Sequence, residues 1–438
     1  MPEGFSRARM RGGMKTQQTT KKAWRRSICV AGQIFNLIPP RMIGELAQRF
    51  AIQSRTFDER SHVFALLLCQ IAHFSGLNET CDVMSVFESE LRRERNCVPP
   101  KRNTFSHANR TRDPALAEAL YWDIVRMLQE QDPSFGSGRP KGKLRRFRFR
   151  RIYALDSSTI SLVHNCIDWA KHRRRKAAVK MHMLTDVPCM LPRCVVIDKA
   201  KHHDITQAAN LCRNLGPGDI VVEDRAYNDW KHQRELDEAG VFFVVREKKR
   251  ARFKVVESKP KDALAKNVLA DEIIELTGPG TRRKYPKKAR RVTAMVEVDG
   301  KWRSMVFLTN NFEWSGAIIA ELYRARWTVE ILFKELKQTL QLKDFLGENE
   351  NAVKWQIWTA LLAHLFLRYL RHLSKWRGSY SRLVGLVRGA VWLHYDAVEL
   401  LRFYGTASPP KPNESPPKAP YLPGFEKILN ASMGQHIA

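Results

Sequence analysis

The hydrophobic pattern of this chain changes near residue 150, and that change limits the folds open to it. From residue 42 to about 130 the apolar positions follow helical spacing. Residues 152–155 and 159–163 instead alternate as strands do, and residues 180–184 and 193–198 predict two more strands. Predicted helices at 205–215 and 228–239 then alternate with predicted strands at 220–222 and 241–245. This order predicts an α/β fold with a mixed sheet, preceded by an all-helical region.

Breaks in the pattern predict the domain limits. Glycines and a proline between residues 136 and 142 indicate a linker, and Asp299-Gly300 predicts a hairpin within a stretch without helical period. A long helix is expected at about 316–340, and prolines crowd residues 408–423. The expected parts are a basic flexible arm (1–25), an N-terminal helical domain (26–130), a linker and basic stretch (131–150), an α/β domain (151–345) with a β-rich insertion (246–310), C-terminal helices (346–405) and a Pro-rich, partly disordered tail (406–438).

The charge balance indicates a polyanionic partner. Lys and Arg number 75 against 45 Asp and Glu, a formal net charge of +30. Such an excess attracts nucleic acid, although ribosomal and membrane-surface proteins share it. Basic runs at 143–151, 171–180 and 282–291 fit phosphate contacts, or alternatively plain solvated faces. Charge alone therefore favours nucleic-acid binding without establishing it.

Cysteine usage and hydropathy predict an intracellular protein. None of the eight cysteines forms a Cys-x-x-Cys pair, and most lie in apolar runs, which favours buried free thiols in a reducing compartment. No apolar run reaches the roughly 18 residues of a membrane span, and residues 1–20 lack the apolar core of a signal peptide. The expected location is cytoplasmic. His202-His203-Asp204 is interpreted as local capping of the helix at 205–215 rather than as a metal site.

Three acidic residues are the candidate catalytic residues. Asp156 lies in or beside the first strand of the α/β region, and Asp224 ends a later buried strand. A carboxylate at the carboxyl end of a strand points into the crevice where α/β sheets bind ligands. Either aspartate alone could equally cap a helix or start a turn. Glu330 lies in the middle of the long predicted helix.

That helix carries a polar stripe. At 100° per residue, Tyr323, Arg326, Glu330 and Lys337 fall within an arc of about 60°. The stripe is about 21 Å long, which matches about six base pairs. One carboxylate among hydrogen-bond donors can face a phosphate backbone and still bind a metal. A solvated charged face with an incidental glutamate remains the alternative.

These residues resemble a known family. Tyr323-x-x-Arg326-x-x-x-Glu330-x-x-x-x-x-x-Lys337 is similar to the Tyr-Arg-Glu-Lys signature of bacterial DDE transposases of the insertion sequence four family. Asp224, followed by Ala226 and Tyr227, resembles their second-aspartate motif, in which Gly often stands where this chain has Ala226. The segment 156–159, Asp-Ser-Ser-Thr, resembles the first motif. The likeness spans about residues 150–345. A looser one covers residues 103–110 of the helical domain at 26–130, which is expected to bind DNA.

The resemblance implies an RNase H-like catalytic domain at 151–345, with the β-rich insertion between the second aspartate and the glutamate. It implies that Asp156, Asp224 and Glu330 bind two Mg²⁺ ions, with Mn²⁺ expected to substitute. It assigns DNA phosphate contacts to Tyr323, Arg326 and Lys337. It also suggests that Trp327 stacks on an extruded base, although a helical tryptophan is more often a core residue.

The function so implied is DNA transposition: metal-dependent strand cleavage at the ends of an insertion sequence, then strand transfer into target DNA. The expected partners are double-stranded DNA, both terminal inverted repeats and target, and a second copy of the chain when two ends are bound, with nucleoid association on DNA. Two alternatives stay open. One is an RNase H-like metal nuclease without strand transfer, and the other is a non-catalytic DNA-binding derivative. The repeat sequence, the target site and the cleavage intermediate are not specified by these motifs.

Overall fold

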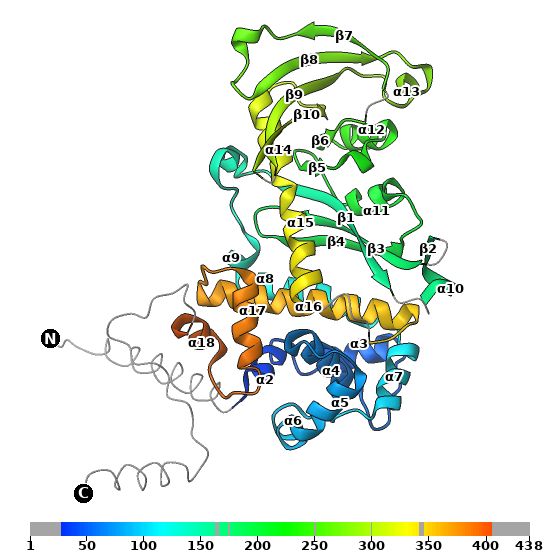
Figure 1. Cartoon of the computed structure of the whole chain (residues 1–438), viewed down its shortest axis with the longest axis vertical. Helices are drawn as coiled ribbons and strands as arrows, with labels where there is room; N and C mark the ends of the chain where they lie inside the picture. The colour runs from blue at the N-terminus through cyan, green and yellow to red at the C-terminus, as the bar shows by residue number, and fades with distance from the viewer. Residues whose placement is uncertain are drawn as a thin grey trace, which may run out of the picture. The chain divides into compact units, whose positions relative to one another are not determined.

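The computed structural model describes residues 28–162, 166–173, 176–248, 251–298, 300–340 and 346–404 (Figure 1). The predicted arm at 1–25 and tail at 406–438 lie outside these residues. The chain divides into two compact units. One unit comprises residues 1–125, 339–347 and 351–438, and the other comprises residues 126–338 and 348–350. Within the described residues, no helix combines the length and apolar character that crossing a membrane requires.

The first unit is helical. Its longest helix, α16 (Glu350–Ser374), is buried over most of its length. Trp355 of α16 is fully buried and donates from its indole Nε1 to the Arg112 carbonyl at 3.0 Å. The remaining helices are α2 (Val30–Phe35), α3 (Met42–Arg49), α4 (Glu59–Ala72), α5 (Leu77–Val86), α6 (Glu88–Arg95), α7 (Arg102–Thr111), α8 (Ala115–Gln131), α17 (Tyr380–Gly389) and α18 (Ala397–Phe403).

The second unit is built on a mixed sheet, which confirms the predicted α/β class. Within the described residues its ten strands run in the order β2-β3-β1-β5-β6-β10-β9-β8-β7, and β4 pairs with β3. Strands β1, β5 and β6 are parallel, and the other pairings are antiparallel. The strands are β1 (Ile152–Leu162), β2 (Lys171–Arg173), β3 (Lys176–Asp186), β4 (Leu191–Lys199), β5 (Ile220–Glu223), β6 (Phe242–Arg246), β7 (Phe253–Ser258), β8 (Val268–Leu276), β9 (Ala289–Val298) and β10 (Lys301–Thr309).

Apolar side chains cover both faces of the sheet centre. Every residue of β5 is buried, as expected of a parallel strand covered on both sides. Val221 packs with α11 (Ala208–Cys212) and α12 (Trp230–Glu238) on one face. Val222 packs on the other face, with α14 (Gly316–Ala325). This alternation decides which neighbouring polar residue faces which helix.

The stretch at 246–310 contains strands β7 to β10, which extend the same sheet through the β6–β10 pair. Val298 is paired with Lys301, and Gly300 has φ +72°, a conformation that glycine adopts without strain. The predicted hairpin is therefore present, although Asp299 lies outside the described residues. The short elements of this unit are α9 (Pro133–Gly136), η1 (Gly142–Phe147), α10 (Ile167–Ala170), η3 (Asp204–Gln207), η4 (Arg225–Tyr227), η5 (Lys261–Ala263) and α13 (Pro279–Lys284).

Two helix predictions need correction. The helix expected at 316–340 is divided into α14, α15 (Trp327–Lys334) and a π-helical turn, η6 (Glu335–Thr339). The break falls at Arg326, whose N–H bonds the Tyr323 carbonyl and whose carbonyl accepts from Val329, so the bonds there span three residues instead of four. Apolar spacing continues across this junction, so periodicity could not reveal it.

The second correction concerns Asp204. The helix expected at 205–215 is a 3₁₀ turn, η3, followed by the short α11. His203 is the N-cap residue, without a side-chain capping bond, and the Asp204 carboxylate bonds other residues instead of capping. Its partners, Ser157 and Lys180, come from distant strands and cannot be inferred from local sequence.

Candidate active site

The two candidate aspartates lie next to each other in space. Asp156 is in the middle of β1, and Asp224 directly follows β5. The last residue pair of the parallel ladder joins Leu155 to Glu223, so Asp156 and Asp224 are the next residues along both strands. Neighbouring strands are about 4.8 Å apart, which brings the two residues into close range. This placement follows from strand register alone.

The helix after the insertion contributes the rest of the site. Helix α15 contacts β1 (Figure 1). The Arg326 guanidinium donates through one NH₂ group to Asp156 Oδ2 and through the other to Glu330 Oε1, both at 2.5 Å. The Tyr323 hydroxyl donates to Asp224 Oδ1 at 3.3 Å. Arg326 therefore joins the glutamate of the helix to the aspartate of the strand.

Lys337 also reaches the strand. Its Nζ donates to the Thr159 carbonyl at 2.6 Å. All four stripe residues, Tyr323, Arg326, Glu330 and Lys337, thus take part in contacts with the two aspartate segments or with each other. The break at Arg326 and the π-helical turn do not disperse them.

Opposing electrostatic effects act on the Asp156 carboxyl. The pKa of this carboxyl is raised to about 6: burial is the main cause, Arg326 and the Ser157 N–H oppose it, and the neighbouring Asp224 and Glu330 add to it. Burial also opposes the charge of Arg326, yet Asp156, Tyr323 and Glu330 together raise the Arg326 pKa. The raised pKa of Asp156 and the raised pKa of Arg326 are compatible. Two acids stabilise the one guanidinium charge, whereas each acid shares that charge with the other. The site holds more negative charge than Arg326 balances.

The hydrogen bonding of Arg326 is also incomplete. Its side chain is 10% exposed, and its buried Nε has no hydrogen-bond partner among the described residues. Buried donors in folded proteins are nearly always paired, and an unpaired one costs about 1–3 kcal/mol. Unpaired buried donors of this kind are typical of functional sites, where the arrangement of side chains is determined by the reaction and not by stability.

The donor set fits a divalent cation by its chemistry. Asp156, Asp224 and Glu330 offer carboxylate oxygens, the ligands that Mg²⁺ and Mn²⁺ prefer. Their oxygens are not all within 4.8 Å of one another; among the described residues only Cys212, Glu223 and His232 form such a group. Arg326, which bonds both Asp156 and Glu330, supplies positive charge between them. Its guanidinium and a metal ion would compete for the same oxygens.

Trp327 stands at the start of α15 and is 42% exposed. The core placement considered from sequence is therefore wrong for this residue. Its ring is partly open to solvent beside Arg326, which leaves it accessible to another molecule.

Sequence reasoning missed a polar network on the other face of β1. Ser157 Oγ donates to Asp204 Oδ1 at 2.6 Å, and Lys180 Nζ lies 3.1 Å from the same oxygen. His182, paired with Ser157 across the sheet, places Nδ1 3.7 Å from it, and burial lowers the His182 pKa to about 4. The sequence did contain a signal for this network. Lys180 and His182 are two positions apart on a predicted strand, so both polar side chains lie on the same face of it.

Comparison with known proteins shows which family this chain matches. Residues 147–366 match the model of the family described as transposase DDE domain. A protein of Sinorhizobium fredii named as a transposase, y4zB, is 30% identical over 251 residues, 57% of this chain and 68% of the relative. A protein of Geobacillus stearothermophilus named as a probable transposase for insertion sequence element IS5377 is 30% identical over 53% of this chain and 60% of its own length.

A third relative carries the family name that the motifs suggested. Transposase InsG for insertion sequence element IS4, from Escherichia coli, is 29% identical over 106 residues, 23% of this chain and 24% of that protein. The family match covers Asp156, Asp224 and Glu330 and the whole stripe.

Proposed function

The chain belongs to the transposase DDE domain family and is a DNA transposase of the IS4 type, and from that premise we propose how its residues act. We propose that residues 151–345 form an RNase H-like catalytic domain and that Asp156, Asp224 and Glu330 are its catalytic carboxylates. The antiparallel strands β1, β3 and β4, continued by the parallel β5 and β6, support this assignment.

One observation carries the proposal. Two aspartates end up side by side on β1 and after β5, and one arginine bonds both the first aspartate and the glutamate of the helix. These residues are far apart in the chain, and 170 positions separate Arg326 from Asp156. A structural ion pair needs no third acid nearby, whereas three carboxylates from separate segments can hold a pair of metal ions.

Asp156, Asp224 and Glu330 would hold two Mg²⁺ ions, or Mn²⁺ in their place. Such a pair, when bound, supplies an activated water and stabilises the leaving oxygen at a phosphodiester. Arg326 would then be released from the acids and become free to bind a DNA phosphate through its planar fork. Tyr323 orients Asp224 through its hydroxyl bond, and Lys337 offers a point charge near β1.

We further propose cut-and-paste transposition on double-stranded DNA. Water attacks the phosphodiester at an element end and breaks it, leaving a 3′-hydroxyl on the element. That hydroxyl then attacks a target phosphodiester in the same site, joins the target 5′-phosphate and releases a target 3′-hydroxyl. The net charge of +30 supports binding to phosphate backbones along both substrates. The exposed Trp327 ring supports stacking on a base displaced from the helix. A homodimer holding the two inverted repeats is proposed from the family.

The test measures two activities of the full chain in Mg²⁺: nicking of DNA that carries an element end, and joining of pre-cut ends to a target plasmid. We expect Asp156→Asn, Asp224→Asn and Glu330→Gln to lower both activities about a thousandfold or more, since metal ions supply several kcal/mol of transition-state stabilisation. End binding in a gel-shift assay should stay near wild type.

The matched control is Glu321→Gln, which removes a carboxylate of α14 that pairs with Arg324 on the surface. It should retain both activities. Loss of DNA binding in the three triad variants would contradict a metal-binding role. Nicking without joining of pre-cut ends in the wild type would favour a nuclease over the proposed strand transfer.

A further inference from the structure

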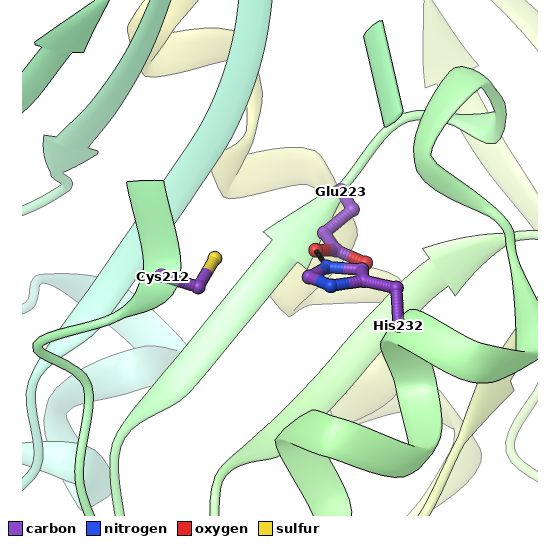
Figure 2. A group of neighbouring side chains, drawn as sticks. All are labelled: Cys212, Glu223 and His232. Atoms are coloured by element: carbon purple, nitrogen blue, oxygen red, sulfur yellow. Dashed lines mark hydrogen bonds and ion pairs between the residues drawn. The ribbon is translucent and has the colours of Figure 1, made fainter. Parts of the chain in front are cut away.

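A buried polar cluster lies directly behind Asp224. Glu223, the last residue of β5, is fully buried, and its carboxylate accepts from His232 Nε2 at 2.7 Å and from Gln233 Nε2 at 3.0 Å. Figure 2 shows the His232 ring against the Glu223 carboxylate, with Cys212 opposite. His232 and Gln233 belong to α12, the helix that follows the Asp224 turn. A buried carboxylate with two side-chain donors from one helix anchors that helix to the strand.

Strand alternation links this cluster to the catalytic face. Val221 faces α11 and α12, and Val222 faces the opposite side of the sheet. Glu223 therefore shares the face of Val221, and Asp224 shares the face of Val222. Because the two side chains leave adjacent residues in opposite directions, a rotation of the strand end that displaces Glu223 also displaces the Asp224 carboxylate.

Gln233 ties down the turn on the far side of Asp224 as well. Its Nε2 also donates to the Tyr227 carbonyl at 3.2 Å. The segment from Glu223 to Tyr227 is thus held at both ends by one buried side chain of α12. Lys248 adds a further bond, from Nζ to the Ala226 carbonyl at 3.2 Å. Asp224 lies between these anchors.

The same cluster could be read as a metal site, because ligand atoms of Cys212, Glu223 and His232 lie within 4.8 Å of one another. The hydrogen bonds favour a different role. Both Glu223 oxygens already have partners within the protein, Oε1 with His232 Nε2 and Oε2 with the Gln233 amide, so a metal ion would have to displace them. All three side chains are buried, and a closed structural site needs four ligands, not three.

We propose that Glu223, His232 and Gln233 are positioning residues that set the orientation of the Asp224 carboxylate from the opposite face of the sheet. The inference rests on the proposed role of Asp224 in metal binding. It extends that role by assigning the buried hydrogen-bonded cluster to the orientation of Asp224 and not to stability alone.

The test compares Glu223→Gln with Val221→Ala, a core truncation on the same strand and the same face. The first readout, in metal-free protein, is amide hydrogen exchange of the segment 224–227. Each variant is measured at the same number of degrees below its own melting temperature. Under these conditions we expect faster exchange of this segment in Glu223→Gln than in Val221→Ala. The second readout is the Mg²⁺ concentration for half-maximal strand cleavage. We expect it to rise about tenfold in Glu223→Gln and to stay unchanged in Val221→Ala.

Equal effects of the two variants on both readouts would overturn the proposal. If Glu223→Gln does not fold, Gln233→Met carries the same comparison, since it removes the bonds to Glu223 and to the Tyr227 carbonyl and keeps the helix. A Co²⁺–thiolate absorption band that disappears in Cys212→Ser would also overturn it, in favour of a metal site. Failure of the catalytic assignment is separate: it would appear as full activity in Asp224→Asn.

Discussion

Two buried arginines of the sheet unit bridge acidic and polar groups in different ways. Arg290 on β9, in the insertion, is 1% exposed and forms two bonds to Asp271 at 2.7 and 2.6 Å, with further bonds to the carbonyls of Asn311 and Trp314. Arg326 bonds two different acids, and within the part of the chain that the structure describes its Nε has no hydrogen-bond partner. The first network is complete, and the second is not.

The carboxyl pKa values follow this difference. Burial works against the charge of Asp271, but Arg290 and Lys259 outweigh it and lower the Asp271 pKa. At Asp156 burial prevails over the partners, and the pKa is raised to about 6. A buried ion pair whose hydrogen-bonding groups all have partners is typical of a structural role. A buried site with more acids than its arginine can pair, and with an unpaired donor, is typical of a site that binds another ligand.

The largest expected effect is at the satisfied pair. Arg290→Ala leaves Asp271 buried with one remaining charged partner, Lys259, and frees two carbonyls. We expect the free energy of unfolding of the sheet unit to fall by about 3–5 kcal/mol, measured by urea denaturation. Arg291→Ala, next in the chain and 20% exposed, is the control and should cost much less. Equal losses would remove the distinction between the two networks.

The complementary change is Arg326→Ala. Removing a charged donor aimed at the reacting groups should lower strand cleavage about a hundredfold. Its stability cost should stay below that of Arg290→Ala, because the side chains of Asp156 and Glu330 are 17% and 33% exposed and can be hydrated. Cleavage assays check the expected loss of activity, and urea denaturation of the same preparations checks the expected stability. A stability loss equal to that of Arg290→Ala would make Arg326 structural.

Asp156→Asn should stabilise the metal-free protein. Because the folded-state pKa of about 6 exceeds the ordinary 3.8, the folded protein binds more protons than the unfolded chain between these values. Its free energy of unfolding therefore falls as pH rises from about 4 to 6. Asparagine avoids this loss, so we expect a gain of about 1–2 kcal/mol at pH 7.5, after allowance for the weakened pair with Arg326.

Urea denaturation in a chelator at several pH values measures that gain. The advantage of the variant should grow between pH 4 and 6 and then level off. Asp271→Asn is the opposite case and should destabilise at pH 7.5, since the Asp271 pKa is lowered. A destabilised Asp156→Asn would show that Arg326 fully compensates the buried charge.

The smallest expected effect is at Trp327. This side chain is 42% exposed, so Trp327→Ala should change the free energy of unfolding by less than about 0.5 kcal/mol. Stacking on a base contributes about 1–3 kcal/mol, so affinity for DNA with an unpaired base at the element end should fall about fivefold or more. Fluorescence anisotropy measures it. Unchanged affinity would leave Trp327 without a DNA role.

Much of the sheet unit could be predicted from sequence because its signals are local. The segments 180–184 and 193–198 lie inside β3 and β4, and the hairpin of β9 and β10 forms at the expected glycine. Asp224 was predicted from a strand end, which the structure has, whereas β1 continues through Asp156 and joins the two strands expected at 152–155 and 159–163. The adjacency of the two aspartates depends on β1 pairing in parallel with β5, which alternation alone does not specify.

The features that escaped prediction depend on distant partners. Arg326 was expected at DNA phosphates, and its bond to Asp156 spans 170 positions. Asp204 has cap-like spacing, yet Ser157 and Lys180 bind its carboxylate. The sequence analysis did not single out Glu223, and only the packing of α12 makes it a buried anchor. Tertiary contacts override local preference in each case.

The central claim is that Asp156, Asp224 and Glu330 share a divalent metal. The most direct measurement is Mn²⁺ binding by electron paramagnetic resonance, on the wild type and on Asp156→Asn, Asp224→Asn and Glu330→Gln, with Glu321→Gln as control. We expect wild type and control to bind Mn²⁺ alike and each triad variant to bind at least about tenfold more weakly. Undiminished binding in all three triad variants would contradict the claim.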